Sequence, residues 1–358
     1  MYMTNLAPID PGPSEPVTQA ADPIGGALGR LYLGEDLSTA ETEILFSALV
    51  EGRLDDPAIA ALLIALKIKG ETTEELIGAA RALRAADRDF DRPDYLFADS
   101  CGTGGDGAGT INLSTAVAFV AAAAGLPIAK HGNRSVTSRC GSADVLEHLG
   151  VKLDVEPAVS RRALDEAGLC FLYAPAYHPG LKHAGPVRRA LKVRTIMNIL
   201  GPCVNPAEPP VQLLGVAEPR LLARVATVLD ALGVKRALVV HGGGLDEIAP
   251  HAETEAVRLT DGRLERLTIA PEQVGLERAP LRAIRGGGPE ENAERLKALL
   301  LGHGTQAERN AVALNAGALL ATAGKADDLR QGVALALATI GSGKALATLD
   351  ALIEVTNG

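Results

Sequence analysis

The chain has 358 residues, of which 47% are hydrophobic, 22% charged and only 3% aromatic, and its formal net charge at neutral pH is −9. This length and composition are typical of a soluble globular protein with one large domain or two unequal ones. Because tryptophan is absent, alanine, leucine and valine must build the core. The excess of acidic over basic side chains argues against general nucleic-acid binding, which requires a basic surface that displaces counterions from phosphates.

Four cysteines without a CxxC pair favour free thiols in a reducing compartment over a disulfide or zinc framework. Residues 1–22 are rich in proline, aspartate and threonine and lack the basic start and apolar core of a signal peptide, so we expect a disordered tail. The longest apolar run, 116–129, is interrupted by Gly125 and Pro127 and is too short to span a bilayer. The sequence therefore predicts a cytoplasmic protein without a membrane segment.

Helix-start signals between residues 23 and 89 predict a small all-helical unit. Two capping boxes are indicated, at Ser38–Glu41 and at Thr72–Glu75, and Asp56 before Pro57 fits an N-cap and first helical turn. Apolar residues between these signals recur at helical spacing.

Beyond residue 93, short apolar strands alternate with predicted helices, of which 114–124 and 220–232 are examples. This alternation predicts an α/β fold with a mostly parallel central sheet beside the small all-helical domain. Several helices from residue 290 onward are expected to close the larger domain. The expected strands are 96–98, 127–129, 170–173, 212–216 and 237–240, with an antiparallel hairpin around Asp261-Gly262.

The densest chemical signal is the glycine-rich string CGTGGDG, residues 101–107, directly after a predicted strand. Glycines at such a junction let backbone N–H groups approach a phosphate, although a simple tight turn is the alternative. The spacing fits neither the dinucleotide fingerprint nor the P-loop, so this loop indicates only an anion site. Ser114 or Thr115, just beyond it, is a natural N-cap for the next helix, and its hydroxyl could also reach a phosphate or a magnesium ion.

A second polar cluster, KHGNR at residues 130–134, follows the next predicted strand, and Ser138 and 141–144 open a further helix. Ligands of open α/β sheets bind at the carboxyl ends of the strands. We therefore expect Lys130 to neutralise an anionic ligand and Gly141-Ser142 to present a helix N-terminus to an oxyanion. A solvated polar loop is the alternative, which two such clusters after adjacent strands disfavour.

The basic segment 178–189 predicts a short helix, most of whose charges are typical of a solvated face. Arg188 differs, because a planar guanidinium can clamp a carboxylate through two parallel hydrogen bonds. The pair Asp246-Glu247 follows a strand and a glycine run, where it could hold magnesium directly or through water. We expect Gly104, Lys130 and Asp246 to converge along one rim of the sheet.

Six strings between residues 99 and 247 together resemble the anthranilate phosphoribosyltransferase family of the tryptophan pathway, within the class III nucleoside phosphorylase and phosphoribosyltransferase-like folds. The strings, in chain order, are GTGGDG, NLSTA, KHGNRSVTSRCGSADVLE, HPGLKHAGPVRR, RTIMNILGP and HGGGLDE. The resemblance implies a helical domain of residues 23–92 plus about 178–200 and an α/β domain of residues 93–177 plus 201–358. It also implies a homodimer formed through the helical domain.

The resemblance further implies Mg²⁺ and two small-molecule substrates, phosphoribosyl pyrophosphate (PRPP) and anthranilate, with no nucleic-acid or membrane partner. The residues implied around PRPP are Gly102, Thr103, Gly104, Gly105, Asp106, Thr110, Asn112, Ser114, Thr115, Lys130 and Ser142. Those implied around anthranilate are Gly102, His131, Asn133, His178, Arg188 and Pro202, with Arg188 meeting the carboxylate, and those implied for the metal are Ser114, Asp246 and Glu247.

The implied reaction is displacement of pyrophosphate at the anomeric carbon of the ribose by the amine of anthranilate. No residue is expected to act as a dedicated acid or base, because the lone pair of an aromatic amine is already free at neutral pH. Catalysis should come from positioning the amine and stabilising the departing charge. The alternatives are a pyrimidine-nucleoside phosphorylase and a non-catalytic nucleic-acid-binding relative of the same fold.

Overall fold

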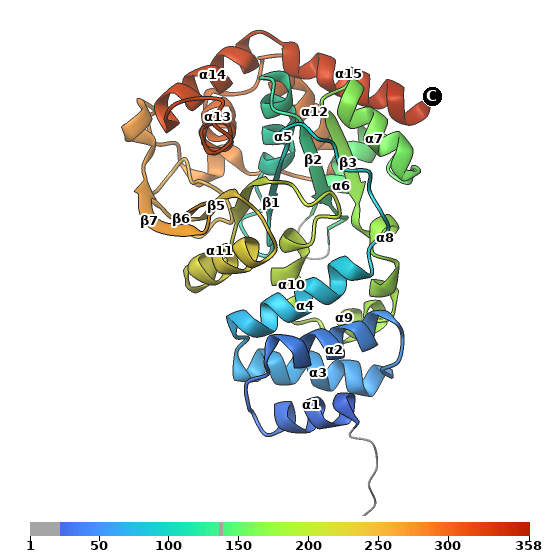
Figure 1. Ribbon diagram of the computed structural model, residues 1–358. Helices are drawn as coiled ribbons and strands as arrows, with labels where there is room; N and C mark the ends of the chain where they lie inside the picture. Colours follow the sequence, from blue (N-terminus) through green and yellow to red (C-terminus); the bar gives the residue numbers. More distant parts are fainter. Residues whose placement is uncertain (1–21, 136–138) are drawn as a thin grey trace, which may run out of the picture.

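The computed structural model describes residues 22–135 and 139–358, which form a helical unit at one end and a larger α/β unit (Figure 1). Nearly all of the tail predicted at 1–22, and Ser138, lie outside the described residues.

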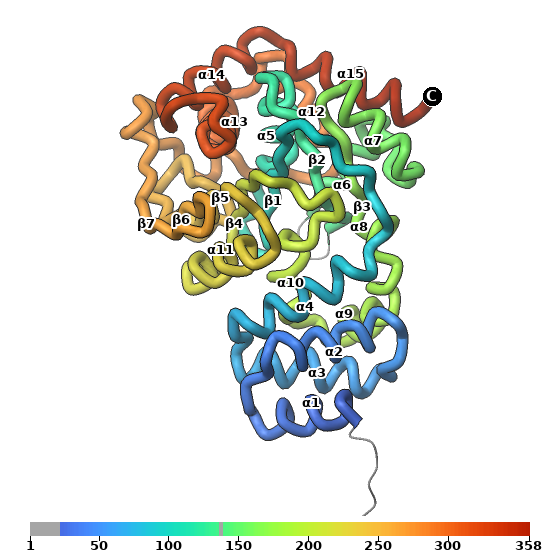
Figure 2. Tube along the Cα trace, viewed as in Figure 1, coloured from blue at the N-terminus to red at the C-terminus, as the bar shows by residue number. Residues whose placement is uncertain are grey.

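Four helices form the N-terminal unit, coloured blue to cyan in Figures 1 and 2: α1 (Pro23–Tyr32), α2 (Thr39–Val50), α3 (Asp56–Lys69) and α4 (Thr73–Ala85). Both predicted capping boxes, Ser38–Glu41 and Thr72–Glu75, are formed. The N-cap predicted at Asp56 is wrong by one residue. Asp55 is the N-cap instead, because it precedes the helix with extended backbone and its Oδ1 atom accepts a hydrogen bond from the Ala58 N–H in the first turn.

A later part of the chain returns to this unit through short helices: α8 (Ala174–Tyr177), the 3₁₀ turns η1 (Pro179–Lys182) and η2 (Gly201–Cys203), α9 (Gly185–Leu191) and α10 (Ile196–Leu200). α9 packs on α3, and α10 packs on both α3 and α4. The single basic helix predicted over 178–189 is wrong in detail, because it is divided into η1 and α9. Pro179 and Pro186 each lie in the first turn of one piece, where the missing N–H is tolerated.

Seven strands form one sheet in the order β3-β2-β1-β4-β5-β6-β7. Strands β1 to β5 run parallel, whereas β6 pairs antiparallel with both β5 and β7, as the predicted hairpin at Asp261-Gly262 requires. The predicted fold class is therefore confirmed. The bounds are β1 (Ala98–Gly102), β2 (Ile128–Gly132), β3 (Leu169–Tyr173), β4 (Val211–Gly215), β5 (Arg236–Gly242), β6 (Thr254–Thr260) and β7 (Arg263–Ile269).

Strands β1 and β2 run further than predicted, into the two polar strings. β1 continues past Ala98 to Gly102, and β2 continues past Ala129 to Gly132. Lys130 can be buried in the β2 extension because its ammonium group finds a partner there: Nζ donates a hydrogen bond of 2.6 Å to the Ser100 carbonyl oxygen. A polar residue therefore does not end a strand when its charge is satisfied inside the sheet.

Helices cover both faces of the sheet. Neighbouring residues of β4 alternate between two cores, since Leu213 belongs to one and Leu214 to the other. The first core contains α5 (Leu113–Ala123), α6 (Ser142–His148), α7 (Pro157–Glu166), α12 (Pro289–Leu300), α13 (Gln306–Thr322), α14 (Leu329–Gly341) and α15 (Lys344–Asn357). The second core contains α11 (Leu222–Ala231) and continues through α10 into the helical unit. The second core thus joins the two units across one face of the sheet.

Short 3₁₀ turns complete the fold: η3 (Pro219–Leu221), η4 (Pro271–Val274) and η5 (Leu281–Ile284). Among residues 22–135 and 139–358, no single helix combines the length and apolar character needed to cross a bilayer. By length and composition alone, α14 and α15 would suffice only as a pair, and they meet at a bend of 69°.

Candidate active site

The candidate site lies at the carboxyl ends of the parallel strands. The sheet continues from β1 to β2 and β3 on one side and from β4 to β5 on the other, so the strand order reverses between β1 and β4. Ligands of α/β sheets bind at such a switch point. Two adjoining cavities lie there: a glycine-loop cavity of about 310 Å³ and a histidine cavity of about 200 Å³, which share Gly102, His131 and Asn133 among other residues.

The glycine-loop cavity contains every residue expected around PRPP. Its loop turns sharply at Gly104 and Gly105, whose φ angles of 66° and 75° favour glycine. Within the described part of the chain, the backbone N–H groups of Gly105, Asp106 and Gly107 donate no hydrogen bond and are available to an anion. The cavity is lined by Gly102, Thr103, Gly104, Gly105, Asp106, Thr110, Asn112, Ser114, Thr115, Lys130 and Ser142, together with Asp246 and Glu247.

The acidic pair reaches this cavity from the loop after β5. Asp246 Oδ2 accepts a hydrogen bond of 2.6 Å from the Gly104 N–H, which joins this loop to the glycine loop. The approach depends on glycine in β1 and β4, because a Cβ atom on Gly102 would lie 2.3 Å from Asp246 Oδ2 and one on Gly215 would lie 1.6 Å from the Asp246 carbonyl oxygen. Gly104, Lys130 and Asp246 thus line one cavity, as expected from the sequence.

The acidic pair has perturbed ionisation. Burial, and then the nearby Asp106 carboxylate, raises the pKa of Asp246 to about 7. Burial and the charge of Asp246 raise the pKa of Glu247, which Lys130 partly opposes. Crowded oxygen donors of this kind fit a hard dication such as Mg²⁺, which would relieve their mutual repulsion. Among residues 22–135 and 139–358, no cluster of three or more His, Cys, Asp or Glu side chains is arranged to hold a metal.

Lys130 lies on the floor of the cavity, where only 3% of it is exposed. Its Nζ atom lies 3.2 Å from Ser114 Oγ, in addition to its bond with Ser100. The predicted N-cap role of Ser114 or Thr115 is wrong, because α5 starts at Leu113, Asn112 occupies the N-cap position, and both residues therefore fall within the first turn of the helix. The Ser114 hydroxyl faces the ammonium group instead, and Thr115 Oγ1 is buried without a hydrogen-bond partner in the described structure.

The histidine cavity contains all six residues expected around anthranilate: Gly102, His131, Asn133, His178, Arg188 and Pro202. His178 Nε2 lies 2.9 Å from His131 Nε2, and His178 Nδ1 is hydrogen-bonded to the Asp87 carboxyl group. Burial and the neighbouring His178 hold the pKa of His131 well below its usual value. The two rings are therefore fixed in a chain that starts at Asp87 and ends in the cavity.

Arg188 is a half-buried cation in the wall of the histidine cavity. Across the described residues, it forms no ion pair or side-chain hydrogen bond with the protein, and burial lowers the pKa of its guanidinium. A guanidinium in this state is suited to a carboxylate ligand. Leu83 and Met197 supply apolar surface beside it.

Asp87 and Arg194 are among the residues of the site that were missed from the sequence. Asp87 lies in a run of mixed charges after α4, where no pattern distinguishes it from solvated neighbours. Arg194 precedes α10 and donates a hydrogen bond of 2.8 Å from Nη1 to the Gly105 carbonyl oxygen. The string RTIMNILGP contains Arg194, but only the fold brings it to the glycine loop.

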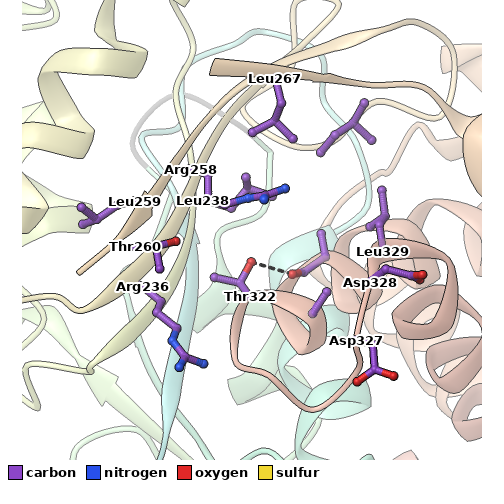
Figure 3. Close-up of a pocket in the computed structure, with 13 residues that line it drawn as sticks. Arg236, Leu238, Arg258, Leu259, Thr260, Leu267, Thr322, Asp327, Asp328 and Leu329 are labelled. Carbon is purple, nitrogen blue, oxygen red and sulfur yellow. Dashed lines mark hydrogen bonds between the residues drawn. The ribbon is translucent and has the colours of Figure 1, made fainter. Parts of the chain in front are cut away.

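A separate cavity of about 390 Å³ lies between β5–β7 and the helices α13 and α14 (Figure 3). Arg236, Arg258, Asp327 and Asp328 line it, and all four are exposed. None of its described lining residues also lines the glycine-loop or histidine cavity, and none belongs to the polar strings. It is therefore not part of the candidate site.

Comparison with known families agrees with this geometry. A glycosyl transferase family model of the α/β domain matches residues 94–346, and a model of the helical bundle domain matches residues 26–86. The chain is 59% identical over 329 residues to an anthranilate phosphoribosyltransferase of Sorangium cellulosum, covering 92% of this chain and 94% of that relative. It is 54% identical over 317 residues to one of Aeromonas hydrophila, covering 88% and 93%.

Solved structures with the same name are similar across nearly the whole chain. The Thermus thermophilus protein superimposes with a TM-score of 0.89 at 44% identity, covering 93% of this chain and 99% of that one. The Saccharomyces cerevisiae protein, in complex with PRPP and Mg, gives a TM-score of 0.86 at 26% identity, covering 93% and 98%. The extent of these matches, together with the paired cavities, shows that the chain belongs to the anthranilate phosphoribosyltransferase family.

Proposed function

We propose that the two cavities hold the two substrates of the family reaction, PRPP in the glycine-loop cavity and anthranilate in the histidine cavity. As a member of the family, the chain transfers the 5-phosphoribosyl group of PRPP to the amine of anthranilate, giving N-(5-phosphoribosyl)anthranilate and pyrophosphate in tryptophan biosynthesis. This placement of the two substrates rests on the observation that the two cavities adjoin and share lining residues. Gly104, Lys130 and Asp246 line the first, and Arg188, a cation without a partner in the described chain, lines the second.

Asp246, Glu247 and Ser114 would hold Mg²⁺ in this proposal, and the ion would neutralise charge on the diphosphate. The donor set supports this, because the raised pKa values of both carboxyl groups reflect a crowded acidic site. The Saccharomyces cerevisiae relative was solved with PRPP and Mg, which agrees with use of the same ion.

The residues of the chain act by binding and orientation. The free N–H groups of the glycine loop and the Lys130 ammonium stabilise the negative charge that develops on the departing pyrophosphate. Arg188 holds the carboxylate of anthranilate, which sets the direction from which the amine approaches the ribose. The chain of Asp87, His178 and His131 fixes the wall beside the amine.

The wider organisation is also proposed from the family. Residues 23–92 with about 178–200 would form the helical domain, and 93–177 with 201–358 the α/β domain, which the packing of α9 and α10 on α3 and α4 supports. A homodimer would form through the helical domain. Exposed apolar residues there support this surface, since Leu33 and Ile68 are 79% and 80% exposed. We further propose that the protein acts in the cytoplasm and that its partners are small molecules, without a nucleic acid or a membrane.

The test is the release of pyrophosphate when the purified chain is given PRPP and anthranilate, with and without Mg²⁺. Release that requires both anthranilate and Mg²⁺ supports the proposal. Phosphorolysis of thymidine in place of this reaction would support the nucleoside phosphorylase alternative and contradict it. If the protein slows the migration of DNA in a gel-shift assay at physiological salt, it has a nucleic-acid partner and this part of the proposal is wrong.

A further inference from the structure

A fourth cavity lies on the far side of the glycine loop, with a volume of about 480 Å³. We call it the arginine cavity, because three arginines from three separate segments line it. Its lining residues are Gly105, Asp106, Gly107, Ala108, Gly109, Arg139, Arg194, Arg285 and Gly286. It shares Gly105, Asp106, Gly109 and Arg194 with the glycine-loop cavity, so the loop itself forms the boundary between the two.

The backbone holds one arginine firmly against the loop. Thr110 and Arg285 form an isolated antiparallel bridge, and the Gly286 N–H donates a hydrogen bond of 2.8 Å to the Gly109 carbonyl oxygen. Glycine is required at 286, because a Cβ atom there would lie 2.7 Å from the Thr110 carbonyl oxygen. The position of Arg285 beside the glycine loop is thus fixed by main-chain contacts.

The balance of charge around the arginine cavity favours an anion. In the described residues, neither Arg139 nor Arg285 forms a side-chain ion pair or hydrogen bond, and Arg194 donates only to the Gly105 carbonyl oxygen. Asp106 is the one carboxylate among the described lining residues, and its Oδ1 atom accepts a hydrogen bond of 3.1 Å from the Ala108 N–H. Three guanidiniums therefore face one carboxylate that is already engaged. Guanidinium groups bind phosphate oxygens in bidentate pairs without a metal.

We propose that the arginine cavity is a second, metal-independent site for inorganic pyrophosphate, which binds there after it leaves the glycine-loop cavity. This inference rests on the proposed function, because that reaction releases pyrophosphate on the other side of the same loop. The two sites differ in chemistry. The glycine-loop cavity contains the Asp246 and Glu247 carboxyl groups, whose charge a dication would offset, whereas the arginine cavity is lined by three guanidinium cations.

Pyrophosphate titration by calorimetry tests the site. With saturating Mg²⁺, the unaltered chain should bind two equivalents of pyrophosphate and the double variant Arg139→Ala with Arg285→Ala only one. Without Mg²⁺, the double variant should lose at least tenfold in pyrophosphate affinity. Arg282→Ala is the matched control, because it removes an exposed arginine close to Arg285 that does not line the cavity. One equivalent for the unaltered chain, or two for the double variant, would overturn the proposal.

Kinetics separate this inference from the proposed function. In the double variant, steady-state turnover should fall several-fold while the single-turnover rate is unchanged, because product release and not chemistry is impaired. A single-turnover rate that falls equally would overturn the exit role and place the arginines in the reaction itself. If the unaltered chain fails to turn over anthranilate, the proposed function fails, whereas the calorimetric result still decides whether the arginine cavity binds pyrophosphate.

Discussion

The half-buried cation in the histidine cavity, Arg188, offers a prediction at the scale of a single residue. Arg188→Ala removes the charged hydrogen bonds to the carboxylate of anthranilate, which should weaken the binding free energy of anthranilate by about 1.5–3 kcal/mol. We expect the KM for anthranilate to rise about 10- to 150-fold, which is that energy expressed as affinity, while the KM for PRPP changes little. Steady-state kinetics with each substrate varied in turn would measure this. Arg189→Ala, which alters an exposed neighbour, is the control, and equal effects on both KM values would contradict the clamp.

The acidic pair gives a second residue-scale prediction. Asp246→Asn with Glu247→Gln should reduce turnover by more than a hundredfold through lost Mg²⁺ binding, whereas Glu253→Gln, on an exposed residue of the same loop region, should not. Unchanged kinetics in the double variant would refute the metal assignment.

The ionisation of Asp246 predicts how Mg²⁺ binding depends on pH. Folding raises the pKa of Asp246 from 3.8 to about 7. The contribution of this group to stability is therefore fully present below pH 3.8, where the carboxyl group is protonated in both the folded and the unfolded chain. This contribution is lost as the pH rises through 7, because the folded chain must then bury the charged carboxylate. Mg²⁺ competes with the bound proton, so its affinity should increase between pH 6 and pH 8. Melting temperatures with and without Mg²⁺ at these two values would show a larger gain at pH 8, and an equal gain would count against this coupling.

At the scale of elements, the site depends on how closely the loop after β5 approaches the end of β1. Gly102→Ala places a methyl group against Asp246 and should destabilise the fold by about 1–3 kcal/mol while reducing turnover more than tenfold. Gly26→Ala is the control, because no atom of the described residues lies within 4 Å of its added Cβ atom. Denaturant unfolding and activity measured on the same samples would test this, and full activity in Gly102→Ala would refute the close approach.

The helices and strands were predicted well where a local sequence pattern sets their ends. They were predicted poorly where contacts between distant parts of the chain set their ends. The capping boxes at Ser38 and Thr72 are local, and both are formed as expected. The extension of β2 through Lys130 could not be predicted, because the carbonyl oxygen that satisfies its ammonium comes from a neighbouring strand. Asp87 was missed for the same reason, since its partner His178 lies 91 residues away in the chain.

At the scale of the whole molecule, the helical unit is expected to carry the dimer surface. Leu33→Glu with Ile68→Glu introduces charge on two strongly exposed apolar positions and should shift a dimer to monomers at micromolar concentration. Light scattering after size-exclusion chromatography would measure the mass. Leu264→Glu, on an exposed apolar residue of β7, should leave the dimer intact. A dimer that survives the first change would exclude this surface.

The grouping of candidate residues was the most predictable property of the molecule. Parallel strands deliver their carboxyl ends to one edge, so the strings after β1, β2 and β5 had to meet once the alternation of strands and helices was recognised. The arginine cavity was not predictable, because Arg139, Arg194 and Arg285 come from segments whose meeting depends on loop geometry.

A crystal structure of the chain with PRPP, Mg²⁺ and a non-reactive anthranilate analogue tests the central claim most directly. The account predicts the diphosphate between Gly104, Lys130 and Asp246, and the carboxylate of the analogue against Arg188. A diphosphate bound away from these three residues, or a carboxylate that turns away from Arg188, would contradict it.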